Sequence, residues 1–226
     1  MWIKICANTN LEDAQLAAQL GADAVGFVFA PSKRQVTPEQ VAKITPHLPL
    51  HVERIGVFPA LPAEAIAQQA HQAGLTAVQL HGGVNLALLQ RLHQLFDGKV
   101  KIIQTVHWQI DAERPSIATV DTIGQQLKEI AQQDIAHRVL IDSKIGNATG
   151  GTGTPFDWSA ARAVLTSAGE RINLIVAGGL SPDNVTEAIH RLNPWGVDVA
   201  SGVEASPGRK SPEKLAAFIK AAREAK

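Results

Sequence analysis

Residues 174–184 read Leu-Ile-Val-Ala-Gly-Gly-Leu-Ser-Pro-Asp-Asn, the pattern of a buried strand, a glycine turn and the start of a helix. The strand part is continuous in apolar residues, which is typical of a parallel strand covered on both faces. Ser181 is suited to cap the helix, and Pro182 to occupy its first position. This stretch therefore predicts one strand–turn–helix unit.

The same order recurs along the whole chain. Apolar runs predict strands at 3–7, 24–29, 54–58, 77–81, 101–106, 138–142, 174–177 and 197–200. Helices are predicted at 11–20, 62–73, 86–96, 120–133, 158–168, 183–192 and 212–225, and another begins at the capping box Thr37-Pro38-Glu39-Gln40. Residues 107–116 are expected to form a loop.

Eight alternating units without a change of composition predict an α/β fold, with one (β/α)8 barrel of parallel strands as a single domain over residues 1–226. The competing fold is an open doubly wound sheet. It would usually contain fewer units and a glycine-rich turn after its first strand, where this chain has Cys6-Ala7-Asn8.

Composition limits the function classes. Lys and Arg together number 21, as do Asp and Glu, and hydrophobic residues make up 45% of the chain. We therefore expect neither disorder nor a nucleic-acid partner, and no apolar run is as long as a membrane span. One cysteine excludes an internal disulfide. With no signal-peptide pattern at the N-terminus, we expect a cytoplasmic protein that is a monomer or a homodimer.

Two side chains at predicted strand ends form a candidate acid–base pair. In such barrels the active site is built at the carboxyl ends of the strands, so Cys6 and Asp142 are expected to converge and could move protons. Lone cysteines are also commonly buried and inert, and that alternative stays open for Cys6.

Late glycine turns form a candidate phosphate site. Gly178 and Gly179 follow the seventh predicted strand, and Ser201 and Gly202 follow the eighth. Barrels often bind phosphate there through backbone N–H groups. The alternative is that these glycines only make tight turns. Gly153, after the sixth strand, either adds a further N–H group or belongs to a flexible loop.

Four more residues are candidates for substrate binding. Arg34 is suited to grip a carboxylate or phosphate, or it belongs to an exposed basic loop. Gln79 and His81 close the fourth strand, where His81 either serves the reaction or anchors a loop. Asp198, inside an apolar strand, either contacts substrate or braces the barrel interior.

A metal site is not expected. Among the eight histidines only His47 and His51 have helical ligand spacing, and Pro46 and Pro49 interrupt a helix there. We expect no cofactor.

The motifs in order are Lys4-Ile5-Cys6, Gly21-Ala22-Asp23-Ala24-Val25-Gly26-Phe27-Val28-Phe29, Ser32-Lys33-Arg34, Val78-Gln79-Leu80-His81-Gly82, Leu140-Ile141-Asp142, Gly150-Gly151-Thr152-Gly153, Phe156-Asp157-Trp158, Ala177-Gly178-Gly179-Leu180 and Val197-Asp198-Val199-Ala200-Ser201-Gly202-Val203-Glu204. Their order resembles the phosphoribosylanthranilate isomerase family from end to end. The family usually has Gly after the cysteine and then Ile or Leu, where this chain has Ala7 and Asn8.

The resemblance implies an Amadori rearrangement in tryptophan biosynthesis, acting on a small phosphoribosyl substrate. It makes Asp142 the general acid and Cys6 the general base, and it assigns Arg34 to the anthranilate carboxylate and the late glycine turns to the phosphate. If Asp142 acts as a general acid, its pKa should be raised, and if Cys6 acts as a general base, its pKa should be lowered.

Two alternatives remain. Another phosphoribosyl-sugar isomerase would share the barrel, although the histidine-pathway isomerase uses two aspartates, which a first-strand cysteine argues against. A non-catalytic phosphate-binding barrel would need no acid–base pair.

Overall fold

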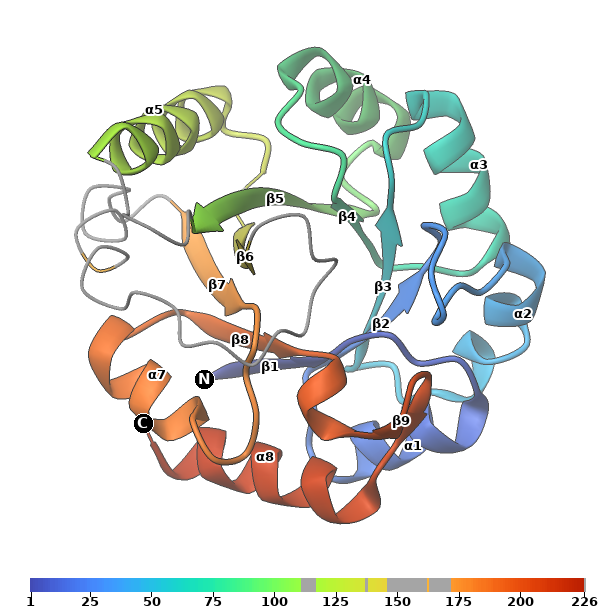
Figure 1. Cartoon of the computed structure of the whole chain (residues 1–226). Helices are drawn as coiled ribbons and strands as arrows, with labels where there is room; N and C mark the ends of the chain where they lie inside the picture. Colours follow the sequence, from blue (N-terminus) through green and yellow to red (C-terminus); the bar gives the residue numbers. More distant parts are fainter. Residues whose placement is uncertain (111–116, 137, 146–161, 163–171, 226) are drawn as a thin grey trace.

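The computed structural model describes residues 1–110, 117–136, 138–145, 162 and 172–225. Within them, eight parallel strands close into a barrel in chain order, with helices around the outside (Figure 1). The predicted (β/α)8 barrel is confirmed.

The barrel strands are β1 (Trp2–Ile5), β2 (Ala24–Val28), β3 (Glu53–Phe58), β4 (Ala77–Leu80), β5 (Lys101–Ile110), β6 (Arg138–Ile145), β7 (Asn173–Ala177) and β8 (Gly196–Val199). The α-helices are α1 (Leu11–Gln19), α2 (Pro38–Ala42), α3 (Ala63–Gln72), α4 (Leu86–Phe96), α5 (Ile117–Gln133), α7 (Val185–Leu192) and α8 (Pro212–Glu224). Short elements complete the described chain: the 3-10 helices η1 (Thr45–His47) and η2 (Ser201–Val203), and the hairpin β9 (Glu204–Ser206) with β10 (Arg209–Lys210). The predicted helix 158–168 lies outside the described residues, apart from Arg162.

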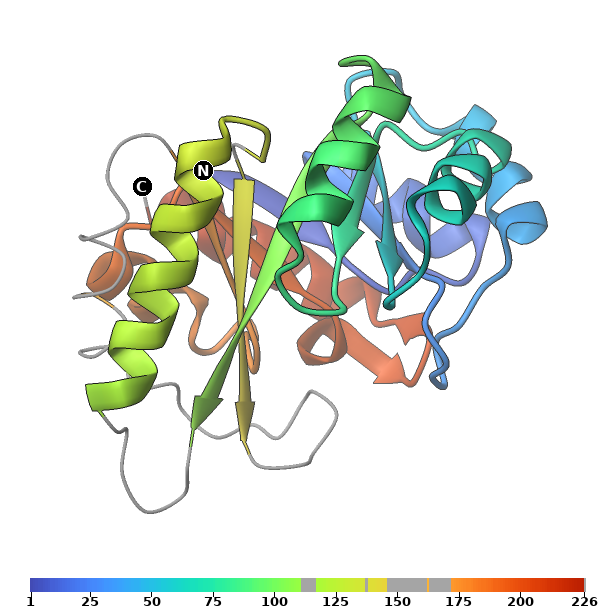
Figure 2. The same cartoon turned by 90° about the horizontal axis from the view of Figure 1, so that it is seen from above.

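The predicted end of the fifth strand was wrong. The first four residues of the expected loop 107–116 continue β5, and its register with β6 runs from His107 opposite Asp142 to Ile110 opposite Ile145. Figure 2 shows these two strands extending together beyond the rest of the barrel. Val106 and Trp108 are buried on the outer face of the strand and alternate with polar residues. This segment therefore lacks the continuous apolar run by which the other strands were predicted. Residues 111–116 lie outside the described part.

Two apolar cores hold the barrel together. The larger core lies between strands and helices. The smaller lies inside the barrel, and its buried members are Ala24, Ile55, Ala77, Ile103, Leu140, Ile175 and Ala177. Because side chains alternate between the two faces of a strand, residues two positions further along point into the same interior.

The amino-terminal mouth of the barrel is closed by an aromatic and ionic plug. Trp2 and Trp195 stack with ring centroids 5.2 Å apart, and the Arg138 guanidinium lies 4.7 Å from the Trp195 ring centroid. Glu53 accepts hydrogen bonds from Lys101 and Arg138, at 2.5 Å each. Burial opposes ionisation of Glu53, but these two hydrogen bonds outweigh it and lower its pKa.

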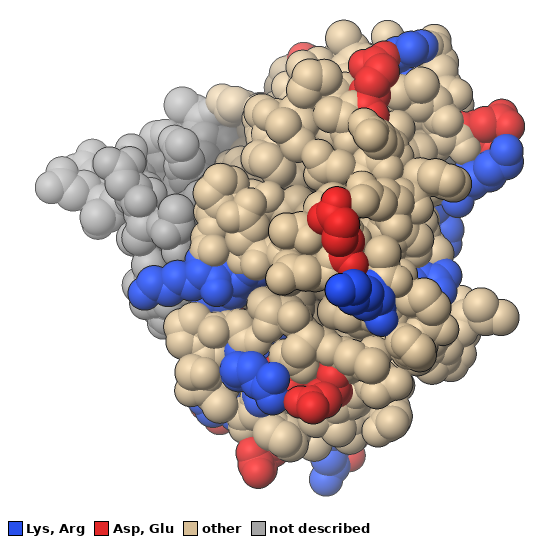
Figure 3. Space-filling view, turned by 90° about the vertical axis from the view of Figure 1, so that its right-hand side faces the viewer, with Lys and Arg blue, Asp and Glu red and all other residues tan. Residues whose placement is uncertain are grey.

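The surface gives no sign of one dominant charge on the face that carries α2 and α3. There, acidic and basic side chains lie interspersed over a mostly neutral surface (Figure 3). None of the helices in the described ranges is long and apolar enough to cross a bilayer.

The plug makes stability depend on pH. Replacing Glu53 with Gln removes the charge that Arg138 and Lys101 bind, so we expect E53Q to lower the free energy of unfolding at pH 7 by about 1–3 kcal/mol. Since the folded-state pKa of Glu53 is lowered, this stabilisation is complete above the unfolded-state pKa of about 4.3 and is lost as the pH falls through the folded-state value.

Urea unfolding at a series of pH values measures this effect. The exposed Glu64, paired with Arg91, supplies the control, and E64Q should leave the unfolding midpoint nearly unchanged. A destabilisation by E53Q that did not shrink in acid would contradict the ionic account of the plug.

Candidate active site

Alternation along the strands decides which side chains enter the site. On β5 the interior residue Ile103 is followed, in steps of two, by Thr105 and His107. On β6 the same step leads from Leu140 to Asp142, which is partly buried. The predicted acid therefore lies on the interior side of β6, above the apolar layer.

A buried polar layer lies above the apolar one. Lys4, fully buried, donates hydrogen bonds to Gln79 Oε1 at 2.7 Å and to Asp198 Oδ1 at 3.1 Å. Gln79 Nε2 then donates to Thr105 Oγ1 at 3.2 Å. Side chains from β1, β4, β5 and β8 are thus joined across the interior. Asp198 therefore braces the barrel interior through Lys4, and its contact with substrate stays a prediction.

Cys6 lies directly above this layer, immediately after β1, and is 7% exposed. Burial raises the pKa of the Cys6 thiol, and the Lys4 ammonium beside it opposes the rise without cancelling it. The expected lowering of this pKa was therefore wrong, because desolvation outweighs the nearby cations. Burial also disfavours charge on Lys4, but Asp198 and Cys6 outweigh it and raise the Lys4 pKa, which keeps this side chain protonated.

Backbone geometry fixes the cysteine. Ala7 has φ of 61°, in the left-handed region that favours glycine, which is the residue the family usually has there. Asn8 is buried and its Nδ2 donates to the carbonyl oxygens of Ile5 at 2.8 Å and Gly26 at 3.2 Å. The unusual Ala7-Asn8 pair thus ties the end of β1 to β2.

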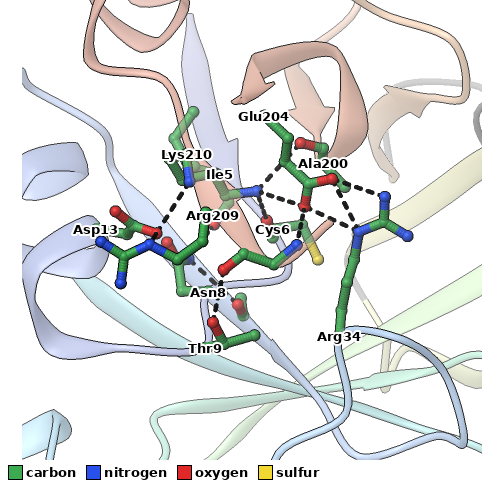
Figure 4. A network of polar contacts seen from close by, with 12 residues as sticks. Ile5, Cys6, Asn8, Thr9, Asp13, Arg34, Ala200, Glu204, Arg209 and Lys210 are labelled. Carbon is green, nitrogen blue, oxygen red and sulfur yellow. Dashed lines mark hydrogen bonds and ion pairs between the residues drawn. The ribbon is translucent and has the colours of Figure 1, made fainter. Parts of the chain in front are cut away.

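A second ionic network joins Cys6 to Arg34 (Figure 4). Lys210 Nζ donates to the carbonyl oxygens of Cys6 at 2.6 Å and Ala200 at 3.1 Å, and lies 3.5 Å from Glu204 Oε1. Glu204 also accepts two hydrogen bonds from Arg34, from Nε to Oε1 at 2.8 Å and from Nη2 to Oε2 at 2.6 Å. Burial opposes charge on Glu204, but Arg34 and Lys210 lower its pKa. A single carboxylate therefore links the predicted base to the predicted carboxylate-binding arginine.

The two late glycine turns lie against each other. Gly178 and Gly179 have φ of 91° and 65°, so this turn needs left-handed backbone. A Cβ on Gly202 would lie 1.9 Å from the carbonyl oxygen of Leu180, so only glycine allows the approach. Ser201 begins η2 beside it. Gly153, the remaining predicted phosphate residue, lies outside the described residues.

The helix after the first turn begins later than predicted. Ser181 and Pro182 precede α7 rather than start it, and α7 begins at Val185. The reason is that Asn184 Oδ1 accepts from Ser181 N at 2.8 Å and Asn184 Nδ2 donates to Gly179 O at 2.9 Å. These bonds hold the glycine turn in a compact loop.

At the mouth formed by β4, β5 and β6, His81 and His107 accompany Asp142. The two imidazole rings meet edge to face with centroids 4.5 Å apart, and His107 Nε2 lies 2.9 Å from the carbonyl oxygen of His81. One ring nitrogen of each histidine and one carboxylate oxygen of Asp142 lie within 4.8 Å of one another. The sequence predicted no metal site here, and His107 was expected to lie in a loop.

The predicted site residues thus fall into three clusters, two of which are joined through Lys210 and Glu204. Cys6, Gln79 and Asp198 meet around Lys4, Arg34 meets Glu204, and Asp142 meets His81. Sequence reasoning gave no role to Lys4, Glu204, Lys210 or His107. Only Lys4 carried a signal in the sequence, since it lies within the apolar run Ile3-Lys4-Ile5 and a charge buried there requires a partner.

Gly26 supplies a test of this packing. A Cβ there would lie 2.8 Å from Cys6 Sγ and 2.9 Å from Lys4 Cε, so G26A must displace the thiol or the ammonium. For the rearrangement that the resemblance implies, we expect G26A to lower kcat/KM by about 10–100-fold, since small displacements of reacting groups reduce the rate by that much. Steady-state kinetics measures it, with G124A in α5 as the matched glycine-to-alanine control. Wild-type kinetics in a folded G26A protein would contradict the packing argument.

Comparisons with known proteins agree with this architecture. The sequence profile of a family described as N-(5'phosphoribosyl)anthranilate (PRA) isomerase matches residues 3–221. N-(5'-phosphoribosyl)anthranilate isomerase of Thermotoga neapolitana is 39% identical over 225 residues, covering 98% of each chain. The crystal structure of phosphoribosyl anthranilate isomerase from Thermotoga maritima superposes with a TM-score of 0.81 at 36% identity, covering 99% of both chains.

A further crystal structure, of a phosphoribosyl anthranilate isomerase in complex with reduced 1-(o-carboxyphenylamino)-1-deoxyribulose 5-phosphate, gives a TM-score of 0.78 at 34% identity, again covering 99% of both chains. Both the profile match and these relatives span nearly the whole chain. The chain therefore belongs to the N-(5'-phosphoribosyl)anthranilate isomerase family.

Proposed function

We propose that this chain converts N-(5'-phosphoribosyl)anthranilate into 1-(2-carboxyphenylamino)-1-deoxyribulose 5-phosphate, with Asp142 as general acid and Cys6 as general base. The observation that carries the proposal is the position of Cys6 directly above the Lys4 layer, in a family barrel whose strand β6 carries Asp142 on its interior side. Its relatives carry this activity in their names.

The reaction needs one proton delivered and one removed. Asp142 donates a proton to the ribose ring oxygen, the bond between that oxygen and C1 breaks, and the ring opens to a protonated Schiff base. The Cys6 thiolate removes the proton from C2, and the electron pair of that C–H bond forms the enolamine. Tautomerisation gives the ketone. The electrons balance within the substrate, so no redox cofactor takes part.

A raised thiol pKa makes the Cys6 thiolate a stronger base but lowers the fraction of molecules that carry it. A thiolate whose parent thiol is weakly acidic takes a proton from carbon more readily, but fewer molecules carry it at neutral pH. The Lys4 ammonium limits that cost because it stabilises the thiolate. We assign Gln79 and Asp198 to this support, since both hold Lys4 in place.

Arg34 is proposed to bind the anthranilate carboxylate. Its side chain is 27% exposed, and Glu204 occupies the edge formed by Nε and Nη2. A guanidinium has a second edge that suits a bidentate carboxylate. Glu204 thereby orients Arg34 while leaving that edge for the substrate.

The phosphate is proposed to bind at the turns after β7 and β8. Gly178, Gly179, Ser201 and Gly202 place their backbone in two adjoining loops, the usual position for phosphate in barrels of this kind. Gly153 remains a predicted contributor from outside the described residues. His81, at the mouth beside Asp142, is proposed to contact the substrate.

Turnover tests the assignment. With freshly made N-(5'-phosphoribosyl)anthranilate, followed by the loss of its anthranilate-type fluorescence, the wild-type chain should be active. We expect C6S and D142N each to lower kcat by about 10²–10⁴-fold, the usual contribution of a positioned acid or base. Asp97 is exposed at the end of α4, so D97N is the isosteric control for D142N and should be as active as wild type.

Folded wild-type protein without turnover would contradict the proposed function and favour a phosphate-binding barrel without catalysis. Full activity in C6S would remove the base assignment alone, and full activity in D142N the acid assignment alone.

A further inference from the structure

Three potential ligand groups lie together at the mouth of the barrel. His81 directly follows β4, His107 lies on β5, and Asp142 lies on β6 opposite His107 in the strand register. One potential ligand atom from each side chain lies within 4.8 Å of the other two, and all three residues are partly buried. Rigid strands therefore hold three groups of metal-ligating type on one side of the active site.

The hydrogen bond of His107 determines which of its ring nitrogens carries the hydrogen. Its Nε2 lies 2.9 Å from the carbonyl oxygen of His81. A carbonyl oxygen only accepts, so Nε2 carries the hydrogen, and in the neutral ring Nδ1 keeps the lone pair. Histidines that bind metals usually donate their other N–H to a carboxylate, a backbone carbonyl or water, which fixes the tautomer. His107 already has that arrangement.

We propose that His81, His107 and Asp142 bind a divalent transition-metal ion, with zinc as the representative, and that the bound ion inhibits the isomerase. Two imidazoles and one carboxylate form the ligand set of many zinc sites, whereas calcium and magnesium prefer oxygen ligands. In a tetrahedral zinc site two ligand atoms lie about 3.4 Å apart, so the side chains must close by up to about 1.5 Å. Three ligands leave the fourth position to water or substrate.

Inhibition follows from the identity of the third ligand and rests on the proposed function. A carboxylate bound to a metal ion cannot at the same time deliver a proton to the ribose oxygen. The ion would also occupy the mouth that the substrate enters. Zinc and substrate should therefore compete, and substrate or product should weaken zinc binding.

The test uses the full chain after chelator treatment. Cobalt, which reports coordination by its visible absorption, is titrated first, and zinc affinity is then measured by competition with a chromophoric chelator. We expect one ion per chain in the wild type. H107Q removes the Nδ1 ligand while its amide N–H can still donate to the carbonyl of His81. This variant should bind zinc at least about tenfold more weakly.

His190, exposed on α7, supplies the matched control, and H190Q should bind as the wild type does. Absence of stoichiometric cobalt and zinc binding in the wild type, or equal affinity in H107Q, would overturn the site. For each protein, turnover with zinc is divided by its own turnover without metal. Zinc bound at the site without loss of wild-type turnover would overturn the inhibition.

Binding and turnover are separate readouts. If the chelated wild type lacks turnover, the proposed function fails while the cobalt and zinc titrations still decide the metal site. If it is active and binds no metal, the proposed function stands and the metal site fails.

Discussion

The buried ammonium of Lys4 is the constraint around which the site is arranged. A charge without exposure to water is tolerated only if it is paired and hydrogen-bonded. Asp198 on β8 supplies the opposite charge at 3.1 Å and Gln79 on β4 a second acceptor at 2.7 Å. These bonds from Lys4 join strands β1, β4 and β8 across the barrel interior, and they hold a cation directly beneath Cys6.

The position of Cys6 depends on a second buried lysine. Lys210, from the hairpin after β8, donates to the carbonyl oxygens of Cys6 and Ala200, so it ties together the ends of β1 and β8 (Figure 4). Its partner Glu204 also holds Arg34. The same carboxylate thereby couples the geometry of the proposed base to that of the proposed carboxylate-binding residue. Any change at Glu204 would act on both.

The barrel could be predicted because each strand and helix is visible locally, as an apolar run or a helical period. The prediction failed at 107–110, where polar side chains alternate with buried ones and the pairing with β6 keeps the strand extended. Helix α7 also begins later than expected, because Asn184 ties the preceding residues to the glycine turn. Both errors arise from contacts between segments, which a local pattern does not contain.

The candidate site shows the same difference between local patterns, which the sequence contains, and contacts between distant segments, which it does not. Cys6, Asp142 and the glycine turns could be named as candidates because strand ends converge in any such barrel. Lys4, Lys210 and His107 were missed because their roles come from partners far away in the chain, such as the bond from Lys4 to Asp198. The direction of the Cys6 pKa was wrong for a related reason, since the degree of burial decides it.

Burial raises the pKa of the Cys6 thiol, and the Lys4 ammonium restrains the rise. The chain contains one cysteine and no tyrosine, so the ultraviolet absorbance of the thiolate can be titrated without interference from another side chain of that kind. We expect the wild-type thiol to titrate above the ordinary value of about 8.5. K4M should move the midpoint further up, and D198N, which removes a nearby negative charge, should move it down. A wild-type midpoint below about 8.5, or a K4M midpoint that does not rise, would contradict the account.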